Sequence, residues 1–315
     1  MTDLSLTQDQ RELAEAIAAL LNDCAPVSRL RSGTDDGSIH AELAEWGWFR
    51  AGLGEDEGGL GLGSAGQALL FLAAGRHLLP PSVLATSLAT GLAPPALRED
   101  LASGAQHASL AFPGRDGTAW CLDREGASLI VLAGDGQLDL LAADVFAGQP
   151  VESFDESLVL EKGRLAPGRT LASAASLQAE LLASATLAGI AGAASALAID
   201  YACLREQFGQ PIGSFQAVKH RCADMGVAAL MAEAQVKMAA ACADEAAPDA
   251  SLQIAAAAHT TLAAALANAA GAIQIHGGIG FTADCDAHRL LKRARVLGQA
   301  IGGEASREAR LLQIA

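Results

Sequence analysis

Residues 205–225 read REQFGQPIGSFQAVKHRCADM and differ in composition from the sequence around them. The flanking segments consist largely of alanine, leucine and other small neutral residues, whereas this stretch is dense in Arg, Gln, Phe, Gly and Pro. Gly209 and Pro211 are strong stop signals for a helix, and the next helix is expected to begin near Phe215. The stretch is therefore predicted to be an elaborate turn between two long helices, with Arg205 in the last turn of the first.

Helices are predicted on both sides of this turn, because long apolar segments there end at Gly or Pro. They are expected at about 177–207, 214–245, 249–276, 285–300 and 304–314. Long antiparallel helices joined by brief connectors form bundles. The segment 173–315 is therefore predicted to be a C-terminal four-helix bundle.

The middle of the chain shows short apolar runs instead of helical periodicity. The runs are HASLAF, TAWCLD, SLIVLAG, LDLLAAD and SLVLEK, and they are separated by turns rich in Gly and Asp. Short strands with such turns are typical of a small antiparallel β-unit. We expect this abbreviated β-domain at residues 105–172.

The N-terminal segment 1–104 is predicted to be a helical domain. Thr7-Gln8-Asp9-Gln10 has the form of a capping box, which starts a helix. Helices are expected at about 7–23, 40–48, 65–75 and 81–92, and Pro94-Pro95 is expected to end the last of them. The fold is therefore predicted to be mainly α, in the order helices, small sheet, helices.

The composition excludes one class of partner and indicates a cellular compartment. The net charge of −15 argues against nucleic acid as a partner, since phosphate contacts need clustered Lys and Arg. The six cysteines have no CxxC spacing, which is typical of reduced thiols in a cytosolic protein. The polar, acidic N-terminus does not resemble a signal peptide. We therefore expect a cytoplasmic protein.

Two long uncharged runs, at 181–199 and 250–275, require a choice between membrane spans and buried helices. Both runs are dominated by Ala, Gly, Ser and Thr, and neither has Lys or Arg bias at its ends. These features favour buried bundle helices, so no membrane span is predicted.

Two patterns imitate binding motifs. Residues 61–66, GLGSAG, fit GxGxxG, but an acidic, Gly-rich loop precedes them where a dinucleotide-binding fold needs a strand. His276, Cys285 and His288 contain suitable metal-binding atoms, but their spacing matches no tetrahedral site. Neither a Rossmann unit nor a metal site is predicted.

Several segments together resemble the acyl-CoA dehydrogenase family. The opening stretch fits RxxFGxPIGxFQ, and residues 274–282, QIHGGIGFT, are similar to the family's QxxGGxGF segment. Residues 43–47 with 57–61 resemble LxxxG…EExGGxG, and residues 75–81 resemble its GR-x-L-x-P stretch. The resemblance covers roughly residues 7–95 and 175–314, in the family's order.

The resemblance implies an N-terminal helical domain, a middle β-domain and a C-terminal four-helix bundle, usually assembled as dimers of dimers. Family members bind FAD and oxidise the Cα–Cβ bond of an acyl-CoA thioester, and they commonly pass electrons to an electron-transferring flavoprotein. The family's RxxF arginine reaches the FAD diphosphate of the neighbouring subunit, a role suited to a planar guanidinium. The cofactor-binding residues implied here are Arg205, Phe208, Gln216, Gln274, Gly277 and Gly278.

The sequence also departs from the family pattern. The flavin-facing T-E-P-x-x-G-S motif is absent, and the nearest segment is 111–117, AFPGRDG. The position of the usual catalytic glutamate falls on Ile301, which cannot accept a proton. The family's alternative position falls on Ala179; Glu180 is adjacent but points about 100° away on a helix. Glu304 could serve only if its loop were rearranged, so the catalytic residue is left unknown.

These departures suggest a chain that holds a partner's FAD but lacks its own base. The leading interpretation is the non-catalytic subunit of a heteromeric acyl-CoA dehydrogenase, in a heterotetramer with two copies of each subunit. Such assemblies occur in the family for bulky sterol-derived thioesters. Two alternatives stay open: an active homo-oligomer with an unusual base, and a scaffold protein without flavin.

Overall fold

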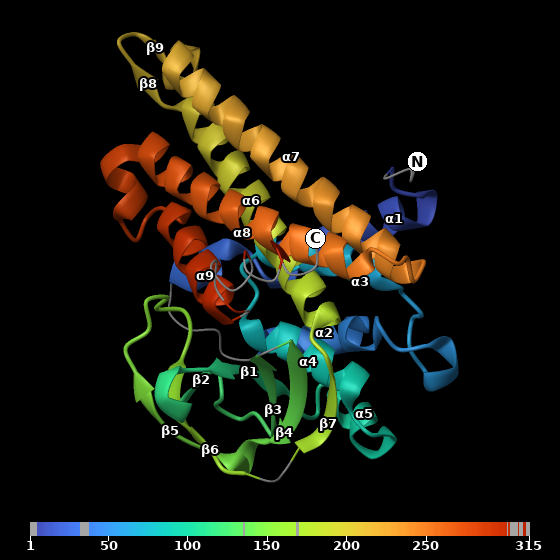
Figure 1. Cartoon of the computed structure of the whole chain (residues 1–315). Coiled ribbons are helices and arrows are strands. Elements are labelled where there is room, and N and C mark those ends of the chain that lie inside the picture. Colours follow the sequence, from blue (N-terminus) through green and yellow to red (C-terminus); the bar gives the residue numbers. More distant parts are fainter. Residues whose placement is uncertain are drawn as a thin grey trace.

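The computed structural model describes residues 5–31, 38–134, 136–167 and 170–300, together with residues 302, 308, 311 and 312. Helices come from both ends of the chain, and the sheet formed by its middle lies to one side of them, at the bottom of Figure 1. The α-helices are α1 (Gln8–Cys24), α2 (Ser38–Trp46), α3 (Ser64–Arg76), α4 (Pro81–Leu92), α5 (Pro95–Ala102), α6 (Leu177–Leu204), α7 (Gln216–Asp244), α8 (Ala250–His276) and α9 (Ala287–Ala300).

The predicted helices are confirmed with two differences in the described residues. Pro95 does not only end α4; it occupies the first position of the short helix α5, where its missing N–H costs nothing. α6 ends at Leu204 rather than near 207, because Arg205 is already extended. The helix predicted at 304–314 lies largely outside the described residues.

The sheet is mixed and has the strand order β5-β6-β2-β1-β3-β4-β7. Its strands are β1 (Ala108–Pro113), β2 (Ala119–Leu122), β3 (Leu129–Gly134), β4 (Gln137–Ala142), β5 (Phe146–Val151), β6 (Leu160–Leu165) and β7 (Thr170–Ala175). The small β-unit is therefore confirmed, but it is not purely antiparallel. β1 and β3 pair in parallel, with Leu110 opposite Val131.

Two strands were not predicted, and both lie at the edges of the sheet. β5 contains Gly148 and Pro150, which are tolerated at an edge but weaken a strand pattern in the sequence. β7 is largely exposed and consists mostly of small residues. An edge strand needs fewer large apolar side chains, so apolar runs alone did not reveal these two.

Alternating side chains give the sheet two buried faces. Leu110, Val131 and Leu140 join the main apolar core, which continues without a break from the N-terminal helices to the long C-terminal helices. Cys121, Ile130 and other residues form a smaller cluster on the opposite face. The first of these two faces packs the sheet against both helical parts of the chain.

The long C-terminal helices pack around α6, whose N-terminal two-thirds is almost completely buried. Asn268 of α8 lies in the centre of this packing. Its Nδ2 donates to the carbonyl oxygens of Ala191 in α6, at 3.0 Å, and Met225 in α7, at 2.9 Å. One buried amide therefore bridges three helices.

Three described segments are long and apolar enough to cross a membrane by length and composition alone: α6, α7 and residues 250–281. The most apolar stretch of α6 is 72% buried inside the protein, against 33% in α7 and 44% in the third segment. The apolar side chains of α6 therefore serve the core. Part of the apolar surface of the other two segments faces outward.

Candidate functional site

The turn after α6 is a short β-hairpin. The Arg205 N–H donates to the carbonyl of Tyr201 at 2.8 Å and closes the helix. β8 (Glu206–Gln207) then pairs with β9 (Gln210–Pro211) through a loop of Phe208 and Gly209. Both loop residues have positive φ, 54° and 78°, as a two-residue type I′ turn requires. This is a conformation that a bulky phenylalanine rarely adopts.

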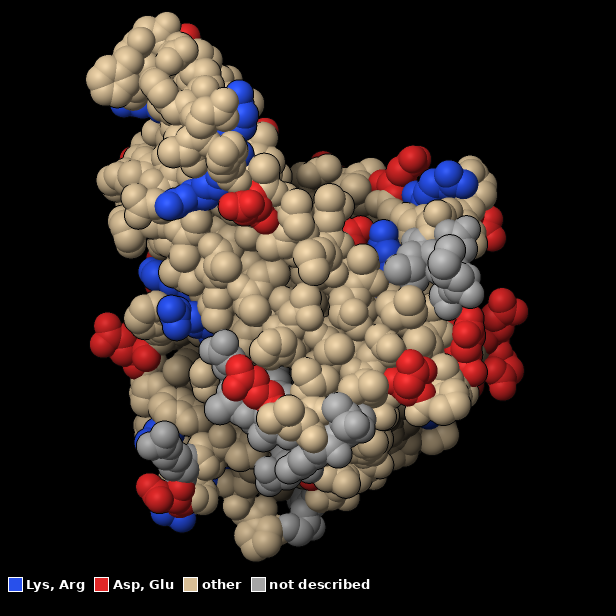
Figure 2. Space-filling model, turned by 45° about the horizontal axis from the view of Figure 1, so that its top comes forward, with Lys and Arg blue, Asp and Glu red and all other residues tan. Residues whose placement is uncertain are grey.

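The hairpin lies at the end of an arm formed by the last turns of α6 and the first turns of α7 (Figure 1). Figure 2 shows the arm as a protrusion with a mostly uncharged surface and a few Lys and Arg atoms along its side. Phe208 is 93% exposed and Leu204 is 81% exposed. Leu230 and Met231, farther along α7, are also exposed. Large apolar side chains in water at this density are typical of a surface that binds another molecule.

The side chain of Arg205 is exposed on this arm. Within the described residues, it has no hydrogen-bond or ion-pair partner, although the protein carries an excess of carboxylates. Its backbone is fixed from both sides, because its carbonyl also accepts the Ile212 N–H at 2.7 Å. The structure thus presents an exposed, unpaired guanidinium on a well-held backbone.

The other predicted aromatic and amide contacts flank the hairpin. The Phe208 ring meets Phe215 edge to face, with centroids 6.0 Å apart. Gln216 is the first residue of α7 and is exposed. A base or ring binding beside the hairpin would therefore meet an aromatic edge and an amide.

The second predicted segment lies where α8 ends. Gln274 is exposed in the last turn, and Gly277 leaves the helix with φ 63° and ψ −139°, which excludes a side chain. A Cβ added at Gly277 or Gly278 would meet no atom within 4 Å. The backbone is therefore open to close approach by a ligand.

A ring stack joins the two segments. Tyr201, one turn before Arg205, stacks on His276, the last residue of α8, with centroids 4.2 Å apart and planes 23° apart. In the sequence, His276 stood out only as a possible metal ligand, and Tyr201 did not stand out. The signal was present: Tyr201 is the only tyrosine and stands four residues before Arg205.

These residues fit the diphosphate end of FAD. A diphosphate is bound by cations and other N–H donors, and this surface offers an unpaired guanidinium and exposed amides. The Gly277 N–H already donates to the carbonyls of Ile273 and Gln274, so the Gly-Gly step contributes room for close approach. Arg205, Gln216, Gln274 and the 277–278 backbone could hold it. Arg205 and Gln216 are exposed on the arm, and Gln274, Gly277 and Gly278 are exposed at the end of α8, so a cofactor bound there would also be open to a second chain.

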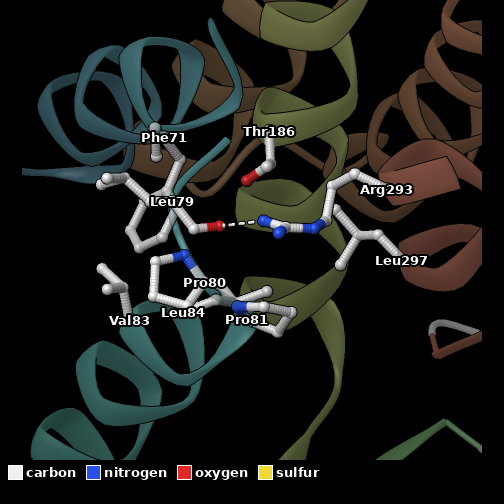
Figure 3. Close-up of a pocket in the computed structure, with 10 residues that line it drawn as sticks. Phe71, Leu79, Pro80, Pro81, Val83, Leu84, Thr186, Arg293 and Leu297 are labelled. Carbon is white, nitrogen blue, oxygen red and sulfur yellow. Dashed lines mark hydrogen bonds between the residues drawn. The ribbon is translucent and has the colours of Figure 1, made fainter. Parts of the chain in front are cut away.

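A small cavity lies beneath α9, next to α3, α4 and α6 (Figure 3). Its volume is about 20 Å³, enough for about one water molecule. It is lined by Phe71, Ala74, Leu79, Pro80, Pro81, Val83, Leu84, Thr186, Arg293 and Leu297. Pockets that hold organic ligands have about 300–1,000 Å³, so this cavity has no room for an acyl group.

Arg293 borders the cavity and is completely buried with its partner Asp155, each 2% exposed. Its Nε donates to Asp155 at 2.8 Å, and Nη1 donates to the carbonyls of Leu78 and Leu79 at 2.9 and 2.6 Å. Burial opposes ionisation of Asp155, but the guanidinium and the hydrogen bonds from Ser157 and Arg293 outweigh it and lower the pKa of that carboxyl. The network connects α9, the segment before β6 and the turn between α3 and α4.

Among the described residues, the positions where the family has its catalytic base carry no carboxylate that is placed to act as one. Ala179 is buried, and the neighbouring Glu180 accepts a hydrogen bond from the Ser176 hydroxyl at 2.5 Å in the first turn of α6. A carboxylate there also complements the helix dipole. Ile301 and Glu304 lie outside the described residues.

The GxGxxG segment binds a carboxylate from another helix of the same chain, that of Asp244. Its Gly63-Ser64 step begins α3, and the backbone N–H groups of Ser64 and Ala65 donate to Asp244 at 2.5 and 2.9 Å. No strand precedes it; the preceding residues 55–57 form a 3-10 turn. The helix end that could have bound a phosphate is therefore occupied by Asp244.

Comparison with known proteins identifies the family. The profile "Acyl-CoA dehydrogenase, C-terminal domain" matches residues 162–313. The chain is 36% identical over 305 residues to acyl-CoA dehydrogenase FadE34 of Mycobacterium tuberculosis, covering 89% of this chain but only 43% of that relative. It is 31% identical to acyl-CoA dehydrogenase IpdE2 of Mycolicibacterium smegmatis over 94% of this chain and 96% of IpdE2. The chain belongs to the acyl-CoA dehydrogenase family.

Solved structures confirm the fold. The Tcur3481-Tcur3483 steroid ACAD superposes with a TM-score of 0.83 at 22% identity, covering 98% of this chain and 97% of that one. The ChsE4-ChsE5 complex of Mycobacterium tuberculosis gives 0.80 at 20% identity, with coverage of 99% and 98%. The predicted helix–sheet–helix architecture is therefore that of this family.

Proposed function

We propose that this chain is the non-catalytic subunit of a heteromeric acyl-CoA dehydrogenase and that it contributes FAD contacts across a subunit interface. The observation that carries the proposal is the placement of Arg205 and Phe208. Both are exposed in or beside the hairpin that joins α6 to α7. The backbone of Arg205 is held by two hydrogen bonds, and its guanidinium, left without a carboxylate, suits a diphosphate that a second chain brings.

Two features argue against a complete active site within this chain. The family's base position carries Ile301, and no carboxylate stands at Ala179. We infer that the partner subunit supplies the base.

The chemistry follows from the family. When bound, FAD would supply the hydride acceptor for oxidation of the Cα–Cβ bond of an acyl-CoA thioester. This chain's residues would bind and orient the cofactor: Arg205 and the 277–278 backbone at the diphosphate, with Phe208, Gln216 and Gln274 beside it. Bulky sterol-derived thioesters are the substrates to test first, because a steroid ACAD shares the fold. An electron-transferring flavoprotein in the cytoplasm would be the electron acceptor.

The test is co-expression of this chain with any acyl-CoA dehydrogenase gene found beside its own. We expect a yellow complex with about one FAD per pair of unlike chains, active on sterol-derived thioesters. Arg205→Ala should empty the flavin without unfolding the complex. Lys219→Ala removes a nearby exposed cation and serves as the control; it should retain flavin.

Each other outcome contradicts the proposal in its own way. Flavin and turnover by this chain alone would establish an active homo-oligomer. Colourless protein with and without partners would indicate a scaffold. Equal flavin loss from both variants would show that only the general charge of the arm matters.

A further inference from the structure

Tyr201 and His276 form a contact between the two segments that the proposed function assigns to FAD. Tyr201 belongs to α6 and supplies the carbonyl that accepts the Arg205 N–H. His276 is the residue directly before Gly277. The stacked rings are therefore close in the chain to both segments: Tyr201 stands four residues before Arg205, and His276 directly before Gly277.

The hydrogen bond of His276 fixes the orientation of its ring. Nδ1 lies 2.8 Å from the carbonyl oxygen of Ala272, and a carbonyl can only accept, so Nδ1 carries the proton. The ring cannot rotate without losing this bond and the stack on Tyr201 at 4.2 Å. His276 is only 8% exposed, although both neighbouring residues of the Gly-Gly segment are exposed.

We propose that Tyr201 and His276 are positioning residues for the dinucleotide: their stack sets the separation between the Arg205 guanidinium and the open backbone at 277–278. A diphosphate has a fixed size, so donors on two different helices bind it well only when their spacing is held before binding. This inference rests on the proposed function, because it assumes that both segments meet one cofactor.

The affinity for FAD is the decisive measurement, made on the flavin-stripped complex. Tyr201→Leu removes the ring and keeps a similar apolar side chain; we expect the dissociation constant of FAD to rise roughly 2- to 12-fold, the full value of one ring pair. Tyr201→Phe keeps the ring and should stay within about twofold of the unsubstituted complex. If the two residues act through the stack, Tyr201→Leu and His276→Leu combined should cost little more than either alone.

The single tyrosine allows a direct readout. Fluorotyrosine incorporated into this chain and combined with unlabelled partner gives one 19F resonance, from position 201. Adding FAD or ADP, which share the diphosphate, should shift it, whereas riboflavin, which has no phosphate, should not. A purely structural stack would leave the resonance in place.

The results separate this inference from the proposed function. If Arg205→Ala loses flavin but Tyr201→Leu binds FAD as tightly as Tyr201→Phe and only melts at a lower temperature, the stack is structural and this inference fails alone. If Arg205→Ala keeps its flavin, or the complex holds none, both fail. A 19F shift with riboflavin as large as with ADP would also overturn the role of the diphosphate.

Discussion

Gly75 of α3 and Gly189 of α6 lie where these two helices cross, and each backbone touches the other helix directly. A Cβ at Gly189 would stand 2.0 Å from the Leu72 carbonyl oxygen, and a Cβ at Gly75 would stand 1.9 Å from that of Thr186. Real atoms do not approach so closely, so neither position accepts a side chain unless the helices separate.

Gly189→Ala should therefore destabilise the protein even though alanine favours helices. We expect the free energy of unfolding to fall by about 1–3 kcal/mol, the usual cost of overpacking a core. Gly192→Ala in the same helix is the control, since its Cβ would meet only Arg76 Nε at 3.8 Å. Urea unfolding of both variants makes the comparison; equal stability of the two would show that the crossing is not tight.

The Arg293–Asp155 pair predicts a loss of stability in acid. The pKa of Asp155 is lowered in the folded protein from its ordinary 3.8. A lowered carboxyl pKa stabilises the fold above the unfolded-state value, and this contribution is lost as the pH falls through the folded pKa. Stability should therefore begin to fall below about pH 4.

Asp155→Asn should remove that part of the acid dependence. It should also cost about 3–5 kcal/mol at neutral pH, because the buried Arg293 charge loses its partner. Glu99→Gln, which breaks the exposed Arg50–Glu99 pair, is the control and should have a much smaller effect. Unfolding followed between pH 7 and pH 3 checks both; an unchanged pH profile in Asp155→Asn would contradict the assignment.

Asp244 binds the start of α3 from the end of α7. Asp244→Ala should lower stability by about 0.5–2 kcal/mol, as for other lost helix caps, because two backbone N–H groups lose their acceptor. Asp224→Asn, on an exposed part of the same helix, should leave stability unchanged. Thermal melting distinguishes them, and equal melting temperatures would refute the capping role.

Phe208 holds an exposed aromatic ring on a left-handed backbone. Such a conformation costs a non-glycine residue about 1–3 kcal/mol, so Phe208→Gly should make the isolated chain more stable by about 1 kcal/mol once the flexibility of glycine is subtracted. The same change should weaken flavin retention in the complex. Gly209→Ala, with φ 78° and open space around it, should destabilise instead. Measuring both the free energy of unfolding and the flavin content tests whether the strained Phe208 lowers stability while it helps to retain flavin.

Much of the architecture could be predicted because the local signals were strong. The capping box at Thr7 is present with both hydrogen bonds, and Gly277 ends α8 where expected. The parallel pairing of β1 with β3 could not be predicted, since strand order depends on contacts between distant residues. The edge strands carry few apolar side chains and leave little trace in the sequence.

The candidate site shows the same division. The segments of Arg205, Gln274 and the Gly-Gly step were placed near helix ends, because Gly or Pro marks each end. Their role in binding FAD was implied by the family resemblance and stays a prediction. The stack of Tyr201 on His276 was missed, because residues 75 apart in the chain meet only through the packing of α6 on α8. The binding of Asp244 to the start of α3 could not be predicted either, since α3 and Asp244 are far apart in the sequence.

The unbroken apolar core has a practical consequence for anyone who wishes to shorten this protein. The boundaries at residues 104 and 172 look like places to divide the gene, yet Leu110 and Val131 of the sheet belong to the same core as the helices on either side. A fragment that ended at either boundary would expose part of that core to water. Truncated versions should therefore be insoluble, and smaller versions would need a redesigned surface rather than a cut.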